Sequence, residues 1–143
     1  KYNNKILHQS KLVKYFGKEN VSNKKIEKDL NNYLKKVKKS NTNYLITKDI
    51  ILIEAMVSDG IEIKDDYKDL FNSKENTIPT DIQILINDRE IGMAVLRLIE
   101  ILGQDKIEDL GSETLYFLIN ALNQMNIDPI RNEILYSVLP LRA

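Results

Sequence analysis

Apolar side chains recur every three or four residues along most of this 143-residue chain, which is the spacing of amphipathic α-helices. The clearest stripe contains Ile26, Leu30, Tyr33, Leu34 and Val37, with lysines on the other faces of the same segment. Nearly every other apolar segment has the same periodicity. The spacing therefore predicts an all-α fold.

Capping residues predict where the helices begin. Ser22, Thr47, Asn87 and Ser112 each precede a helical segment and can accept a hydrogen bond from a free backbone N–H group. The Asp128-Pro129 pair predicts another start, because proline at the first helical position loses no hydrogen bond. The expected helices cover residues 4–16, a segment from 23 that contains the 26–37 stripe, 48–58, a short piece near 66–71, 88–102, 112–124 and 129–139.

Residues 82–86 fit two structures. Alternation of Ile82, Ile84 and Ile86 suits a strand, whereas Ile82, Leu85 and Ile86 share one side of a helix. No partner strand is evident, so we expect a helix. The triplet 61–63 also alternates and predicts a brief extended piece.

Charge divides the chain into two parts. Thirteen basic and three acidic residues occur up to Lys48, against 8 basic and 18 acidic residues from Asp49 onward. The boundary between two structural parts is expected further along the chain, in the polar stretch before Pro79. We expect a basic helical part at 1–72, a linker at 73–79 and an acidic helical-hairpin part at 80–143, packed as one domain.

The connections between residues 88 and 139 are short, which predicts three successive antiparallel helices. The spacing of these hairpins resembles that of tetratricopeptide-type and HEAT-type repeat proteins, without their signature residues. The resemblance implies an antiparallel helical bundle or a solenoid-like array of helical hairpins, here the C-terminal end of a longer one. Gly92, inside an expected helix, predicts close packing against a neighbouring helix.

Few residues suit catalysis or ligand binding. The chain has no Cys, no glycine-rich phosphate loop and a single histidine, His8, without a catalytic motif around it. Asp105, Glu108 and Asp109 could share one side of a helical turn and hold a hard cation such as calcium. Acids are also common at helix starts, however, where they stabilise the first turn. We therefore predict no catalytic residue, metal site or cofactor, and keep a carboxylate-dependent enzyme fragment as a remote alternative.

Candidate contact residues fall into two sets. Lysines of the segment from residue 23 could bind a protein partner or the phosphates of nucleic acid. Aromatic side chains of the last two helices could belong to the core or contact a neighbouring repeat. The residues are Lys24, Lys25, Lys28, Lys35, Lys36 and Lys39 in the first set and Tyr116, Phe117 and Tyr136 in the second.

These observations favour a non-catalytic helical scaffold or protein-interaction module. Opposite charge in its two parts predicts a protein partner or a second copy bound head to tail, with an affinity that falls as salt rises. Nucleic-acid binding by the lysine-rich helix is the alternative. No segment is apolar enough to span a membrane, and the compartment is undetermined, because a removed leader would leave no trace.

Overall fold

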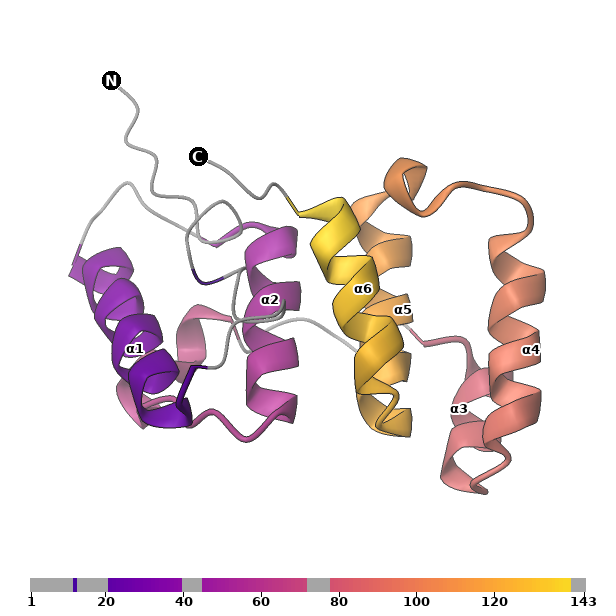
Figure 1. Ribbon diagram of the computed structural model, residues 1–143, viewed down its shortest axis with the longest axis horizontal. Coiled ribbons are helices and arrows are strands. Elements are labelled where there is room, and N and C mark those ends of the chain that lie inside the picture. The colour runs from indigo at the N-terminus through magenta and orange to yellow at the C-terminus, as the bar shows by residue number, and fades with distance from the viewer. Residues whose placement is uncertain (1–11, 13–20, 40–44, 72–77, 140–143) are drawn as a thin grey trace.

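Helix α1 (Asn23–Lys39) buries the stripe that the sequence predicts. Ile26, Leu30, Leu34 and Val37 face the core, and the Ser22 hydroxyl oxygen accepts a hydrogen bond from the Lys25 backbone N–H group at 3.3 Å. This bond satisfies one of the free donors of the first turn, so the predicted cap is confirmed. The computed structural model describes residues 12, 21–39, 45–71 and 78–139 (Figure 1). The expected helix at 4–16, His8 and most of the predicted linker lie outside these residues.

Helix α2 (Thr47–Ser58) is the most deeply buried helix, and apolar side chains cover almost its whole circumference. Thr47 is its first residue and not its cap, so the predicted cap is wrong. The Asp49 carboxylate supplies the acceptor instead, because it takes a hydrogen bond from the Ile46 N–H group at 3.2 Å. Asp49 itself is buried, with 2% of its surface exposed.

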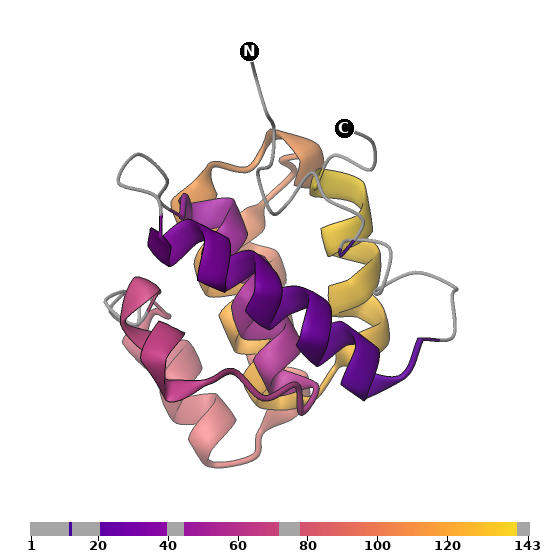
Figure 2. The same cartoon turned by 90° about the vertical axis from the view of Figure 1, so that its left-hand side faces the viewer.

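Helix α2 ends at Ser58, as the sequence predicts, and Gly60 follows with a backbone φ of +96° that side-chain-bearing residues rarely adopt. The chain then runs extended along α1 (Figure 2), with Ile61 and Ile63 buried. Two α1 side chains take the place of a partner strand. Glu27 accepts from the Glu62 N–H group at 3.0 Å, while Asn31 accepts from the Lys64 N–H group at 3.0 Å and donates to the Glu62 carbonyl at 3.1 Å. The short 3-10 helix η3 (Asp65–Leu70) follows.

Residues 82–86 are helical, within α3 (Thr80–Asn87). The next helix, α4 (Ile91–Leu102), begins three residues later than the sequence predicts and ends at Leu102 as predicted. Asn87 belongs to α3 and does not cap α4, so this predicted cap is wrong. The turn between the helices uses Arg89 at a φ of +62° and a 2.8 Å bond from the Glu90 N–H group to the Leu85 carbonyl.

The chain continues through the 3-10 helix η4 (Ile107–Asp109) into α5 (Ser112–Met125) and α6 (Asp128–Val138). Ser112 and Asp128 are the first residues of their helices and make no capping bond, so these two predicted caps are also wrong. Pro129 lies in the first turn of α6 as expected. The described part of the chain is helical without strands, which confirms the all-α fold.

Two hydrophobic clusters fill the interior, and α5 contributes to both. Leu115, Tyr116 and Ile119 pack with α1, α2, the 61–71 segment and α6. Leu118, Ala121 and Leu122, on another side of α5, pack with α3 and α4. The main partner of α5 is α2, and the main partner of α4 is α3. The predicted three-helix unit of α4, α5 and α6 is therefore replaced by two hairpins, α3–α4 and α5–α6, because α2 occupies the place beside α5.

Arg131 of α6 is completely buried, which the sequence did not indicate. Its guanidinium donates to both carboxylate oxygens of Asp59, at 2.9 and 2.8 Å, and to the side-chain oxygen of Asn123 at 3.0 Å. It also reaches the Ala55 carbonyl at 3.3 Å. One side chain thus joins the carboxyl end of α2 to α5 and α6.

Candidate interaction surfaces

The six candidate lysines of α1 are all exposed. Four of them, which we call the lysine face, are spaced so that they share the side of α1 opposite its buried stripe. The lysine face consists of Lys24, Lys28, Lys35 and Lys39. None of these four forms an ion pair with another described residue. Their charges are therefore available to a ligand or a partner.

Two other α1 lysines are already engaged within the protein. Lys25 pairs with Asp29 at 3.4 Å. Lys38 donates to the Asp66 carbonyl at 2.6 Å, and its ammonium lies 6.0 Å from the centre of the Tyr67 ring. Lys36 is also exposed and lies beside the lysine face. The basic character of α1 therefore faces outward over most of its length.

The opposite end of the molecule is acidic. Helix α1 lies at one end of the longest axis and the α3–α4 hairpin at the other (Figure 1). Helix α1 contains seven lysines and two acids, whereas the α3–α4 hairpin, residues 80–102, contains four acids and two basic residues. The two ends therefore carry net charges of opposite sign, while the acidic η3 (Asp65–Leu70) packs against α1 at the basic end. A dipolar arrangement of this kind favours contact between unlike ends.

Helix α4 has an apolar surface that no described residue covers. Met93, Leu96 and Ile99 are 56%, 58% and 57% exposed and lie on the side opposite the buried Ala94 and Leu98. We call these three side chains the α4 outer face. Three large apolar side chains that lie side by side and are more than half exposed form a candidate contact surface.

Gly92 adjoins the α4 outer face, one turn before Leu96. A side chain built at Gly92 would meet nothing within 4 Å. The close helix contact that the sequence predicts at this glycine is therefore not made by any described residue. The backbone at the start of α4 is open to solvent on the same side as the apolar side chains.

Charged groups flank the α4 outer face. Arg97 donates to Asp81 at 2.7 Å and to Glu100 at 3.3 Å. The hydrogen bond from Arg97 is the main reason why the pKa of Asp81 lies below its usual value. All three groups are substantially exposed, and carboxylates outnumber cations along this edge.

The sequence did not single out the α4 outer face, although a signal was present. Nine of the 12 residues of α4 are apolar, which is more than one buried stripe requires. An excess of this kind indicates either a helix buried on all sides or one with a second, exposed apolar side. The position of α4 at the edge of the molecule decides between them (Figure 1).

The three candidate aromatic residues differ in their surroundings. Tyr116 is buried between α5 and α2, and its hydroxyl donates to Glu54 at 3.2 Å. Burial and the negative charge of Glu54 raise the pKa of Tyr116 to about 12. Phe117 is half-buried against the second cluster, and Tyr136 is 36% exposed on α6. The structure does not bring the three together into one surface.

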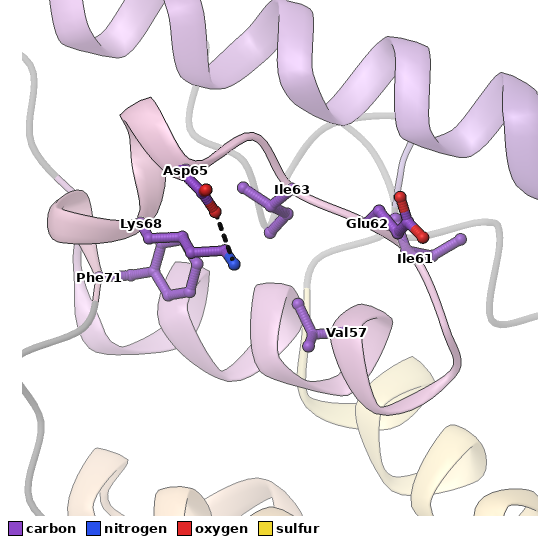
Figure 3. A pocket seen from close by; sticks show the side chains of 7 residues that line it. All are labelled: Val57, Ile61, Glu62, Ile63, Asp65, Lys68 and Phe71. Atoms are coloured by element: carbon purple, nitrogen blue, oxygen red, sulfur yellow. Dashed lines mark ion pairs between the residues drawn. The ribbon is translucent and has the colours of Figure 1, made fainter.

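Two shallow hollows lie near the basic end. The first, of about 500 Å³, is lined by Val57, Ile61, Glu62, Ile63, Asp65, Lys68 and Phe71 (Figure 3). An ion pair of 2.9 Å joins Asp65 and Lys68 across it. The second, of about 520 Å³, lies between α1 and the 61–64 segment, and Lys24 and Lys28 of the lysine face line it. Both hollows contain paired or hydrogen-bonded carboxylates, without a nucleophile and base in contact.

The candidate acids at 105–109 are exposed and lie around η4. Among residues 12, 21–39, 45–71 and 78–139, no three acidic or histidine side chains converge in a way that could hold a metal ion. Within the same ranges, no helix combines the length and the apolar character needed to cross a bilayer.

No protein-family model, curated protein or solved structure matches the chain significantly.

Proposed function

We propose that the protein is a non-catalytic helical interaction module that associates with a second copy of itself head to tail. The observation that carries this proposal is the position of the two charged regions. The basic α1 and the acidic α3–α4 hairpin lie at opposite ends of the long axis (Figure 1), so one copy presents to the next a surface of opposite charge. Complementary charge of this kind steers association and selects its orientation.

Salt is the simplest test of this mechanism. Raising ionic strength from about 0.01 M to about 1 M shortens the screening length from about 30 Å to about 3 Å. Sedimentation velocity should therefore give a sedimentation coefficient that rises with protein concentration at low salt and falls to the value of the monomer at high salt. A chain that sediments as a monomer at every concentration and salt level would contradict the proposal.

Nucleic-acid binding through α1 is the second candidate, because all six candidate lysines are exposed. Lysine contacts to phosphates would give binding that is insensitive to sequence and weakens steeply with salt. Fluorescence anisotropy with a labelled duplex and a labelled single strand at low salt tests this candidate. Binding that the substitutions Lys24→Gln, Lys28→Gln, Lys35→Gln and Lys39→Gln abolish together, in a chain that stays monomeric, would favour it over self-association.

A further inference from the structure

We infer that the α4 outer face of one copy is the docking site for the lysine face of the next. This inference rests on the proposed self-association and names the two surfaces that would meet. Three observations support it: no described residue covers the α4 outer face, carboxylates outnumber cations beside it, and the lysine face has no ion pairs with described residues. The proposed partner is therefore a second copy of this chain, because its lysine face is complementary in charge to the carboxylates beside α4.

The chemistry of the two surfaces is compatible in detail. A lysine side chain has four methylene groups below its ammonium, so it can lie on an apolar surface and still place its charge at the edge. Lysines laid across Met93, Leu96 and Ile99 would cover these side chains with their methylene groups. Their ammonium groups would then reach the carboxylates beside α4, among them Glu100, which is 68% exposed on its side chain.

An alternative occupant is the α4 outer face of the second copy, in a symmetric pair. Apolar contacts would suit this arrangement, but it would bring two acidic ends together. Like charges at an interface oppose association. The two arrangements also differ in symmetry, because a head-to-tail contact joins two different surfaces, whereas a symmetric pair joins two identical ones.

Two variants separate these arrangements. The first, with Lys24→Gln, Lys28→Gln, Lys35→Gln and Lys39→Gln, removes the charges of the lysine face and keeps good helix-forming residues. The second, with Leu96→Lys and Glu100→Gln, places a cation in the α4 outer face and removes an acid beside it. Ile130→Lys is the matched control for Leu96→Lys, because Ile130 is 53% exposed on α6.

Each variant alone should associate about tenfold more weakly than the unaltered chain, since each lacks one of the two surfaces. An equimolar mixture should form one-to-one dimers and stop there, because only one productive contact remains between the two variants. Circular dichroism should give the same helical signal for both variants and for Ile130→Lys, which should associate like the unaltered chain.

Three results would overturn the inference, and they differ in what else they affect. If the lysine variant still forms dimers while the Leu96→Lys variant does not, the contact is the symmetric one. If neither variant alters an association that the unaltered chain shows, other surfaces form the contact and the proposed function stands. If the unaltered chain never associates, the proposed function fails together with the inference.

Discussion

Replacing Arg131 by Met removes a charged side chain that has no exposed surface and keeps most of the side-chain volume. The guanidinium contacts Asp59, Asn123 and the Ala55 carbonyl, and its side chain has no exposed surface. After the substitution, the Asp59 carboxylate loses its partner, whereas the Ala55 carbonyl keeps a 3.1 Å bond from the Asp59 N–H group. The substitution thus removes the ion pair with Asp59 and the hydrogen bonds to the side-chain oxygens of Asn123 and Asn132.

The loss of stability depends on how well the Asp59 carboxylate can be hydrated once its partner has been removed. Removing one partner of a buried ion pair costs about 3–5 kcal/mol. The Asp59 side chain is already 32% exposed and can rehydrate, so we expect the lower limit, about 3 kcal/mol. For a chain of this length that loss lowers the melting temperature by about 10 °C.

Urea unfolding followed by far-ultraviolet circular dichroism measures this change. Arg97→Met is the matched control, because Arg97 also contacts two carboxylates but its side chain is 45% exposed. The midpoint of the control should stay close to that of the unaltered chain. Adding Asp59→Asn to Arg131→Met should cost little more, since that carboxylate has already lost its partner. If Arg131→Met were as stable as the unaltered chain, the buried contacts would not hold α2 to α6 and the reasoning would be refuted.

Three further predictions concern stability. Above pH 10 an unfolded tyrosine loses its proton, whereas folded Tyr116 keeps it to about pH 12. The free energy of unfolding, followed as urea midpoints, should therefore fall between these pH values, and it should fall less in Tyr116→Phe. Gly92→Ala should raise the free energy of unfolding by about 0.5 kcal/mol in urea titrations, because alanine favours a helix and a Cβ at this position meets no neighbour; a lower value would mean that the site is not open. Asn31→Ala should lose about 1–2 kcal/mol with its two bonds to the 61–64 segment, and hydrogen exchange there should accelerate, whereas exposed Asn32→Ala should change neither.

Local patterns predicted the helices well, because amphipathic spacing and end signals depend on neighbouring residues alone. The stripe of α1, the end of α2 at Ser58 and the helical state of 82–86 all follow from such signals. The start of α4 did not, because the turn before it uses Arg89 at a positive φ, which an arginine does not signal. The first polar residue of a segment also proved an unreliable cap, as at Thr47, where Asp49 supplies the acceptor.

Features that depend on distant residues could not be predicted. Arg131 follows Asp128 by three residues and looks like an exposed helical arginine; its contact with Asp59 spans 72 positions of sequence. The position of α2 beside α5 likewise decides which helices become neighbours. The lysine face was predicted because charge is visible in the sequence, whereas the α4 outer face required knowing that α4 lies at the edge.

The contribution of α5 to both hydrophobic clusters affects how the molecule unfolds. A helix whose neighbouring sides belong to different cores cannot melt with one of them and remain intact in the other. Calorimetry should therefore give a single heat-absorption peak, with equal calorimetric and van't Hoff enthalpies, in spite of the division of the chain into a basic and an acidic part.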